Sequence, residues 1–445
     1  MSIDFNFFDE LPKDWKCARV KNILDYNHHY PIGDGDHGSI KPEMYQDDGI
    51  PYLRVQNLSW GFDINYDNLV YISEEVNQAN NKSILIPKDI LIAKTGATVG
   101  KMAIIPKSMK QANTTSSVGK VTVNHKLFNH KYFAYLFASP MFQEQIKEKA
   151  YQKSAQPGFN IDDLVEFNII IPPLDIQNDI SSYLDKKTSK IDTTIAKNKE
   201  LISLLEEKRT TLINQVVTKG LNPEVPMKDS GIEWIGEIPE HWDIRKFNHI
   251  SNKIVVGYVG SIGESYTNET GIPLIKTENI KNGKLNLDKL SYVTQDFHLK
   301  NKKSQIKSGD IIIARHGESG RSCVVPQTVT TANTLNIVIL QTKKDMNSYY
   351  YSYLLNSFLI QEYMQSIQGG AVQGVVNTED ISFLKVHVPP LIEQNQIVNY
   401  LDKKTSKIDE TIIKIKENIG LLEEYKTSLI HHVVTGKIDV RGEEI

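Results

Sequence analysis

The clearest pattern of apolar and polar positions occurs twice, in residues 172–218 and again in residues 389–435. Apolar side chains recur there with a period close to 3.5 residues, which predicts a helix with a coiled-coil seam. Pro172-Pro173 and Pro389-Pro390 precede the two patterns, so each helix is expected to begin just after a strand has ended. A helix of about 45 residues extends roughly 65–70 Å.

A heptad register assigns the seam positions in each copy. In the first copy they are Leu184, Thr188, Ile191, Ile195, Asn198, Ile202, Leu205, Arg209, Leu212 and Val216. In the second copy they are Val398, Leu401, Thr405, Ile408, Ile412, Ile415, Ile419, Leu422, Lys426, Leu429 and Val433. Neither helix can bury such a stripe alone, so we expect the two to pack together.

The two helical segments are copies of each other. At a constant offset of 217, 32 of their 47 positions are identical, and LDKKTSKID at Leu184–Asp192 recurs unchanged at Leu401–Asp409. A long repeat fixes the architecture before any other signal, and here it gives two units of about 220 residues. Parallel and antiparallel pairing are both within reach of the linker. We expect the antiparallel pair, because a repeated sequence order favours a two-fold arrangement.

The segment before each helix reads as a globular domain. Short β-rich runs such as ILIA, MAIIP, IIIA and IVIL are bounded by Gly, Pro and Asn, and helical stretches follow near Asn129–Ala150 and Asn347–Ile367. The predicted fold class is α+β, with two mixed α/β domains joined by two long antiparallel coiled-coil helices and an internal pseudo-two-fold. The predicted segments are domains 1–171 and 243–388, helices 172–219 and 389–436, linker 220–242 and tail 437–445.

Two similar but diverged domains held a fixed distance apart are suited to recognising two different sites at a fixed separation. DNA is such a target, because dimeric readers engage half-sites about 34 Å apart. The net charge of −3 argues against a protein that coats nucleic acid by bulk charge, so contacts would be local. Two cysteines, no signal-peptide pattern and no long apolar run predict a cytoplasmic protein without membrane contact.

The glycine motifs do not indicate a nucleotide-binding enzyme. Gly33–Gly38 matches GxGxxG but carries two carboxylates and leads into Lys41-Pro42, so we interpret it as a turn from which His37 and Lys41 are candidates to approach DNA. Gly96–Lys101 lacks the spacing of a phosphate loop, and Gly317–Arg321 keeps its turn and basic residue. Each is either a turn between strands or a contact to DNA phosphate through Lys101 and Arg321.

Base reading favours Arg or Lys on guanine and Asn or Gln on adenine. Further candidates lie in polar segments without a structural periodicity. They are Lys94, Thr95, Asn113, Thr114, Gln152, Lys153, Ser154 and Gln156 in the first domain, and Arg315, His316, Asn333, Gln368 and Gln373 in the second. Each is also explained as an ordinary solvated loop residue.

The lysine pairs of the repeated helices, Lys186-Lys187 and Lys403-Lys404, form either a solvated face or, with Asp185, Asp192, Asp402 and Asp409, a duplicated docking surface. The aromatic residues within 132–137 and 349–353 are predicted to lie in the core. We find no [DNS]-P-P-[YFW] element of an amino-methyltransferase, no HExxH, no paired CxxC and no nuclease triad of recognisable spacing. The chain is therefore predicted to have no catalytic residues and no metal site.

Three segments resemble one family. GLNPEVPMKDSGIEWIGEIPEHW (Gly220–Trp242), the VPPL…QIVNYLDKKTSKID run and VVTGKIDVRGE (Val433–Glu443) are similar to specificity subunits of type I restriction–modification systems, as is the GIPYLRVQN stretch at Gly49–Asn57. The resemblance covers essentially the whole chain. It implies a non-catalytic subunit in which each globular domain reads one part of a bipartite, asymmetric DNA site and helix length sets the spacer.

The resemblance also implies partners. In that family the helices bind two adenine methyltransferase subunits, and motor-nuclease subunits join for restriction. S-adenosylmethionine, and ATP and Mg²⁺ for restriction, would then belong to partner subunits. The alternatives are a methylation-only or orphan specificity subunit, and a scaffold whose duplicated helices bind two protein partners without DNA.

Overall fold

The computed structural model describes residues 11–152, 157–281, 283–317, 320–367 and 374–442. The chain forms two compact units, of which unit 1 comprises residues 1–198 and 417–445, and unit 2 comprises residues 199–416. Each unit therefore contains one globular domain and a segment of each of two long helices, α5 (Leu174–Lys219) and α11 (Leu391–Val434).

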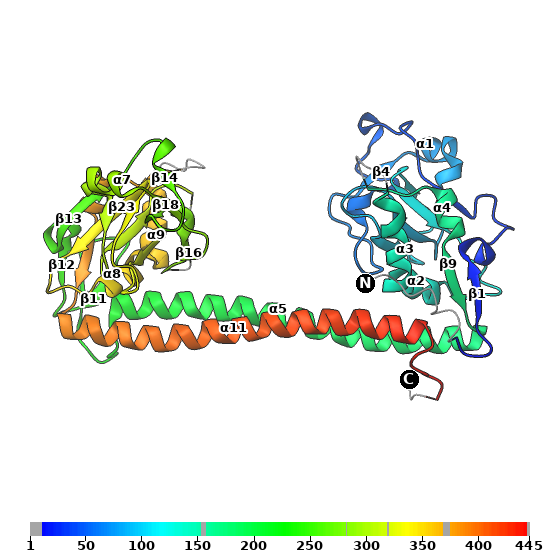
Figure 1. The fold of residues 1–445 in the computed structure, drawn as a ribbon. Coiled ribbons are helices and arrows are strands. Elements are labelled where there is room, and N and C mark those ends of the chain that lie inside the picture. Colours follow the sequence, from blue (N-terminus) through cyan, green and yellow to red (C-terminus); the bar gives the residue numbers. More distant parts are fainter. Residues whose placement is uncertain (1–10, 153–156, 282, 318–319, 368–373, 443–445) are drawn as a thin grey trace. The chain divides into compact units, whose positions relative to one another are not determined.

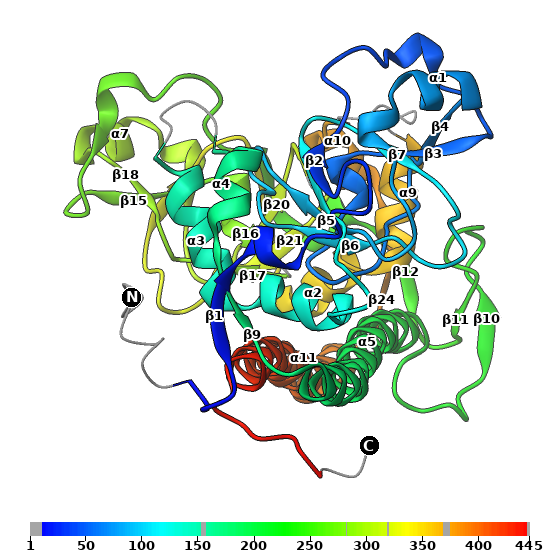
Figure 2. The same ribbon diagram turned by 90° about the vertical axis from the view of Figure 1, so that its right-hand side faces the viewer.

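The two long helices pack side by side and antiparallel (Figures 1 and 2). In unit 1 the first part of α5 lies beside the last part of α11, where Lys426 Nζ is 2.7 Å from a carboxylate oxygen of Asp192. In unit 2 the last part of α5 lies beside the first part of α11, where Arg209 Nε is 2.9 Å from Asp409. These pairs confirm the predicted antiparallel arrangement.

Unit 1 is built around a four-stranded antiparallel sheet in the order β2-β8-β5-β6. Its strands are β2 (Ile32–Asp34), β8 (Val118–Val121), β5 (Ile90–Ala93) and β6 (Met102–Ile104). The smaller sheets are β4 (Val70–Ile72), β3 (Ile50–Leu53) and β7 (Asn113–Thr114), and the pair β1 (Lys16–Arg19) and β9 (Asn168–Ile171). The helices are α1 (Glu74–Ala79), α2 (His130–Ala138), α3 (Pro140–Ala150) and α4 (Ile161–Glu166).

Unit 2 repeats this plan with the sheet β13-β23-β20-β21. Its strands are β13 (Ser251–Val256), β23 (Ile337–Thr342), β20 (Ile311–Ala314) and β21 (Ser322–Val324). A five-stranded sheet joins β14 (Tyr266–Thr267), β18 (Ser291–Val293), β15 (Ile272–Ile275), β22 (Ala332–Thr334) and β19 (Gln305–Ile306). Strand pairs join β12 (Asp243–Lys246) to β24 (Lys385–Val388), β10 (Met227–Asp229) to β11 (Glu237–Pro239), and β16 (Ile280–Lys281) to β17 (Lys284–Leu285). The helices are α6 (Phe247–Ile250), α7 (Gln295–Lys300), α8 (Ser348–Leu355), α9 (Phe358–Ile367) and α10 (Thr378–Phe383).

One inner strand of each main sheet, β5 in unit 1 and β20 in unit 2, is apolar at every position because both of its faces are covered. In β5, Ile90 and Ile92 point into the core that contains α2 and α3, whereas Leu91 and Ala93 point into a second core on the opposite face. In β20, Ile311 and Ile312 likewise belong to different cores. Alternate side chains of a strand face opposite sides of a sheet, so a continuous apolar run is required here.

Each predicted helical stretch after the sheet is in fact two helices. The break in unit 1 comes at Ser139, before Pro140 at the first position of α3, where its missing N–H is tolerated. The break in unit 2 follows Leu355, and α9 begins at Phe358. Most of the aromatic residues of α2 and α8 lie in the core as predicted, although Tyr349 is exposed.

Candidate DNA interface and helix-docking contacts

The main sheet of each unit ends in three neighbouring loops, which we call the loop edge. In unit 1 it comprises residues 35–41, 94–101 and 115–117, because β2 and β5 end where β8 and β6 begin. A backbone hydrogen bond from Gly35 N–H to Thr115 O at 3.1 Å joins two of these loops, and one from Gly96 N–H to Pro157 O at 2.9 Å joins a third to the segment before α4. In unit 2 the corresponding described residues are 257–263, 315–317, 320–321 and 335–336.

Most predicted DNA contacts that the structure describes lie on or beside the loop edge. His37, Lys41, Gln152, His316 and Arg321 are exposed. Thr95, Lys101 and Arg315 are half-buried, and the Arg315 guanidinium donates to the carbonyl of Val376 and to Asn377 Oδ1. Lys153, Ser154, Gln156, Gln368 and Gln373 lie outside the described residues.

Four predicted contacts need correction, because their side chains are buried and bonded inside the domains. Asn113 and Asn333 are fully buried; Asn113 donates to Asn77 Oδ1 at 2.9 Å, and Asn333 donates to Ser304 Oγ at 2.7 Å. The Thr114 hydroxyl donates to Leu53 O at 2.8 Å. Lys94 is also buried and forms an ion pair with Asp34. These residues hold neighbouring elements together and are unavailable to a base.

The sequence interpretation missed the role of the two carboxylates in Gly33–Gly38. The Asp36 carboxylate accepts hydrogen bonds from the backbone N–H groups of Gly38, Ser39 and Ile40 at 2.8–3.0 Å. Burial raises the pKa of Asp36, but the Ser39 hydroxyl and these N–H groups outweigh it and hold the pKa below its usual value. The carboxylate is thus turned inward and bonded. The available signal is Asp36 with Gly38 and Ser39 two and three residues later, a composition typical of a local turn.

The glycine turns of both units are held by the same contact. Gln143 Nε2 of α3 donates to Gly100 O at 3.1 Å, and Gln361 Nε2 of α9 donates to Gly320 O at 3.0 Å. A Cβ on Gly100, which has a φ of +92°, would lie 2.2 Å from Gln143 Oε1. The turns therefore require glycine for structural reasons, and Lys101 and Arg321 stand directly after them.

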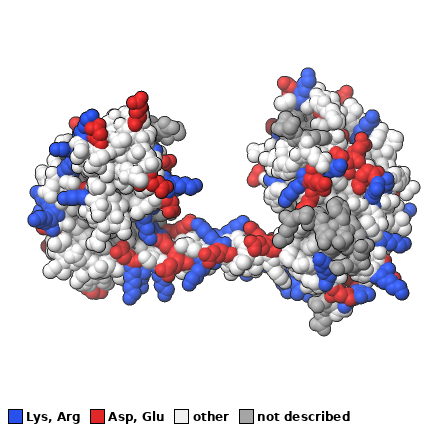
Figure 3. Space-filling view, in the orientation of Figure 1, with Lys and Arg blue, Asp and Glu red and all other residues white. Residues whose placement is uncertain are grey.

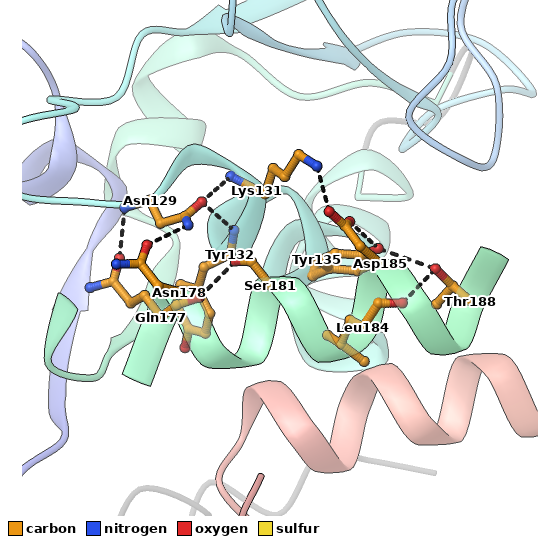
Figure 4. Close-up of polar contacts among 10 residues, drawn as sticks. All are labelled: Asn129, Lys131, Tyr132, Tyr135, Gln177, Asn178, Ser181, Leu184, Asp185 and Thr188. Carbon is orange, nitrogen blue, oxygen red and sulfur yellow. Dashed lines mark hydrogen bonds and ion pairs between the residues drawn. The ribbon is translucent and has the colours of Figure 1, made fainter. Parts of the chain in front are cut away.

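Helix α5 is bonded to its own domain through α2 (Figure 4). The Tyr135 hydroxyl donates to Asp185 Oδ1 at 2.8 Å and lies 3.2 Å from Thr188 Oγ1. Asn129, the N-cap of α2, donates its backbone N–H to Gln177 Oε1 at 2.9 Å. Burial raises the pKa of Tyr135, so its hydroxyl stays protonated and serves as a donor.

Unit 2 makes the same contacts with the second copy of the sequence. The Tyr353 hydroxyl donates to Asp402 Oδ1 at 2.7 Å and lies 3.3 Å from Thr405 Oγ1. Asn347, the N-cap of α8, donates its N–H to Gln394 Oε1 at 2.8 Å. The repeated helix thus fixes each domain at an equivalent position.

Each domain also binds the end of the other long helix. In unit 1 the Tyr132 hydroxyl donates to Val434 O of α11 at 3.1 Å. In unit 2 the Tyr350 hydroxyl donates to Val217 O of α5 at 3.0 Å, and His387 Nε2 bonds the same carbonyl. These bonds satisfy carbonyls of the last helical turn, which have no partner within the helix.

The structure places the predicted seam residues of both helices among the buried or half-buried side chains. Off the seam, Leu204 and Leu421 are 54% and 65% exposed. The two charged seam residues, Arg209 and Lys426, pair with Asp409 and Asp192 across the helix interface. Charge at these positions is therefore tolerated because each has an opposite charge on the facing helix.

These pairs correct one interpretation of the repeated LDKKTSKID segment. Its aspartates are not a free docking surface, because Asp185 and Asp402 bind tyrosines and Asp192 and Asp409 bind the facing helix. Among the lysines, Lys186, Lys403 and Lys404 are exposed, and Lys187 is half-buried with its ammonium 5.2 Å from the Tyr183 ring.

Charge is mixed across the surface in view in Figure 3. Lys and Arg alternate with Asp and Glu along the helices and on both domains, without one continuous basic face. Among the described residues there is no group of three or more His, Cys, Asp or Glu that could hold a metal ion. Within the same part of the chain, no helix is long and apolar enough to cross a membrane.

Comparisons with known proteins agree on one family. The family model of the type I restriction modification DNA specificity domain matches twice, at residues 12–203 and 239–419. The MjaVIII specificity subunit of a type I restriction enzyme from Methanocaldococcus jannaschii is 23% identical over 444 residues, covering 97% of this chain and 95% of that protein.

Two solved structures share the fold. A chain from a type I restriction–modification system aligns with a TM-score of 0.73 at 14% identity, covering 96% of this chain and 100% of that chain. The HsdS subunit from Thermoanaerobacter tengcongensis aligns with a TM-score of 0.53 at 14% identity, covering 96% and 98%. With the family model matched over most of the chain, this protein belongs to the type I restriction–modification DNA specificity family and carries two of its specificity domains.

Proposed function

We propose that this chain is the sequence-reading subunit of a type I restriction–modification complex, and that each unit reads one half of a bipartite, asymmetric DNA site. One observation carries the proposal. The contacts that fix each domain on the helices are repeated pair by pair, as in Tyr135–Asp185 and Tyr353–Asp402, whereas the loop edges differ in sequence. Two domains that are attached to the helices in the same way but have different loop edges are suited to binding two different DNA sequences.

Within each half-site, loop-edge residues that are exposed or half-buried would supply two kinds of contact. Lys41, Lys101 and Arg321 are suited to phosphate, which sets position without reading sequence. His37 and His316 are suited to base edges in the major groove. The net charge of −3 and the mixed surface favour such local contacts over a broad basic face.

The helices would set the number of base pairs between the half-sites. α5 and α11 contain 46 and 44 residues and are continuous. At about 1.5 Å per residue, a change in helix length alters the spacing between readers by a defined amount. A flexible linker would not fix a spacer in this way.

The sides of α5 and α11 away from the seam would dock two methyltransferase subunits. In unit 1 the exposed positions off the seam include Lys190 of α5 and Leu421 and Tyr425 of α11. In unit 2 the positions equivalent in the repeat to Lys190 and Leu421 are Lys407 of α11 and Leu204 of α5, and both are exposed. Exposed apolar side chains ringed by charge are typical of interaction sites, and two equivalent sites suit two copies of one partner.

The chemistry would then belong to the partners. Adenine methylation needs S-adenosylmethionine and a base flipped out of the duplex, and both tasks would fall to the methyltransferase subunits. For restriction, ATP and Mg²⁺ would be used by motor-nuclease subunits. The role of this chain is to bind, orient and space the DNA.

Co-expression with the methyltransferase subunit of its own system tests the proposal. Methylated adenines in the genome of the expression host are mapped by single-molecule sequencing. The proposal predicts one split, asymmetric motif with adenine methylated on both strands. A stable complex that methylates no motif would overturn it and favour a scaffold that does not read DNA.

The proposed docking of methyltransferase subunits is tested by measuring the mass of the complex. Leu204→Asp and Leu421→Asp are each expected to remove one methyltransferase subunit, and the double variant both. Val259→Asp, a change of an exposed apolar residue on the loop edge, is the control and should keep both partners. Mass photometry of the purified complexes gives the stoichiometry. Full retention of both partners by the double variant would exclude this surface.

A further inference from the structure

The first loop of the loop edge in unit 1 is held by close backbone contacts. The Asp36 carboxylate accepts hydrogen bonds from the three backbone N–H groups of residues 38–40. Gly35 is packed so closely that a Cβ there would lie 2.0 Å from Thr114 O. Between these two fixed points stands His37, whose side chain is 74% exposed. The loop therefore presents an imidazole on a fixed backbone.

Two further side chains fix the ring of His37. Its Nε2 lies 3.0 Å from Asp34 Oδ1, while the other oxygen of that carboxylate is bound by Lys94. The Lys94 side chain is only 7% exposed. Burial raises the pKa of Asp34, but its bonds to Lys94 and His37 outweigh this and lower the pKa, so the carboxylate is charged. A charged carboxylate can only accept, so in the neutral imidazole Nε2 is the nitrogen that donates to Asp34, and Nδ1 is left for another partner.

The equivalent loop of unit 2, residues 257–263, has a different residue at the position of His37. Gly257 takes the place of Gly35, since a Cβ there would lie 2.0 Å from Thr334 Oγ1. Tyr258 replaces Asp36 and donates its hydroxyl to Ser261 O at 3.1 Å. The residue at the position of His37 is Val259, which is 59% exposed. The two units thus present a polar ring and an apolar side chain from equivalent places.

We propose that His37 and Val259 are specificity-determining residues, one for each half-site, and that Asp34 and Lys94 are positioning residues for His37. The inference rests on the proposed function and adds the chemistry of two contacts. His37 Nδ1 accepts a hydrogen bond from an exocyclic amino group, which adenine and cytosine offer in the major groove. Val259 packs on the C5-methyl group of thymine.

This assignment also accounts for the buried ion pair. An isolated carboxylate at Asp34 would repel DNA phosphate, and Lys94 neutralises it from inside the domain. In unit 2 the apolar Val259 needs no such support, and the counterpart of Lys94, Arg315, is instead bonded to Val376 and Asn377. His37 is thus supported through Asp34 by the side chain of Lys94, whereas Val259 receives no support from Arg315.

The test uses the full complex with its methyltransferase subunits and synthetic duplexes of the mapped motif, in which each base pair is replaced in turn by the other three. His37→Val is expected to lower discrimination about tenfold at one base pair of the first half-site, and to leave the second half-site unchanged. Asp34→Asn is expected to weaken discrimination at that same base pair. Unchanged melting temperatures would show that both variants are folded.

The second arm tests Val259 with DNA in which thymine is replaced by uracil, which lacks the methyl group. Wild-type complex should bind the uracil duplex less tightly at one position of the second half-site, and Val259→Ala should bind both duplexes alike.

Several outcomes would overturn the inference. Discrimination unchanged in His37→Val, or an equal loss for every duplex, would show no contact or a phosphate contact. No effect of uracil in the second half-site would exclude the methyl contact. A wild-type complex without any bipartite motif would instead overturn the proposed function itself.

Discussion

The Tyr135 hydroxyl donates a 2.8 Å hydrogen bond to the carboxylate of Asp185, which lies on the first of the two repeated helices. The second unit reproduces this bond between Tyr353 and Asp402 at 2.7 Å. An identical helix sequence therefore meets an equivalent residue in each diverged domain. We infer that the repeated segment has been kept for the attachment of the domains as well as for helix pairing.

Removal of this bond should loosen one unit only. Tyr135→Phe leaves Asp185 with Lys131 as a partner, so we expect a loss of about 1 kcal/mol in the stability of unit 1. Tyr353→Phe should do the same to unit 2. Hydrogen exchange measured by mass spectrometry assigns the loss to a unit, with Tyr66→Phe, at an exposed site, as the control. Equal loosening of both units by either variant would contradict separate attachment.

The register of the helix seam is tested by neighbouring isoleucines. Ile412 is 8% exposed and Ile413 is 56% exposed. Ile412→Asp should cost more than about 3 kcal/mol, because a charge would be buried in the seam without a partner. Ile413→Asp is the matched control and should stay within about 0.5 kcal/mol of wild type. Urea unfolding compares them, and similar midpoints would mean that the register is wrong.

His387 should make unit 2 sensitive to acid. Burial lowers its pKa to about 4, despite the bond to Val217 O that acts in the opposite direction. An unfolded histidine has a pKa of about 6.5, so the unfolded chain binds the proton more readily. The contribution of His387 is thus fully present above about pH 6.5 and is lost as the pH falls toward 4, up to about 3 kcal/mol.

Thermal unfolding between pH 7 and pH 4 measures this loss. The matched variant is His387→Ile, because Ile170 holds the corresponding position in unit 1. It should flatten the acid dependence of unit 2. Identical pH profiles for the variant and the wild type would show that His387 is not responsible.

Helix length is tested by insertion. Seven residues, two turns that preserve the heptad, are added after Asn198 in α5 and after Lys416 in α11. The mapped motif should gain about three base pairs in its spacer, since about 10 Å of helix matches three steps of 3.4 Å. The half-sites should stay unchanged. A changed half-site with the old spacer would contradict the role of the helices.

The helices could be predicted from sequence because their signals are local and periodic. The heptads, the flanking prolines and the repeat, identical at 32 of 47 positions, predict α5 and α11, and residues such as Ile195 and Ile412 are among the buried ones. The short apolar strands were equally clear, because β5 and β20 are buried on both faces.

The candidate DNA contacts were harder to predict because polarity alone does not reveal burial. Asn113 and Asn333 have the composition of base readers, yet each fills a buried site formed by residues about thirty positions away. In the sequence Lys94 resembles a basic loop residue, because only the folded structure brings Asp34 of β2 beside it. The missed residues, Asp34 and Asp36, acquire their roles only through contacts that the tertiary fold creates.

The most direct test of the account is an exchange of one reader. Residues 1–165 are replaced by the corresponding segment of another specificity subunit, and the methylated adenines of the host genome are mapped again. One half-site should change while the spacer and the other half-site stay the same. A change in both half-sites, or in neither, would contradict the claim that each unit reads its own half of the DNA site.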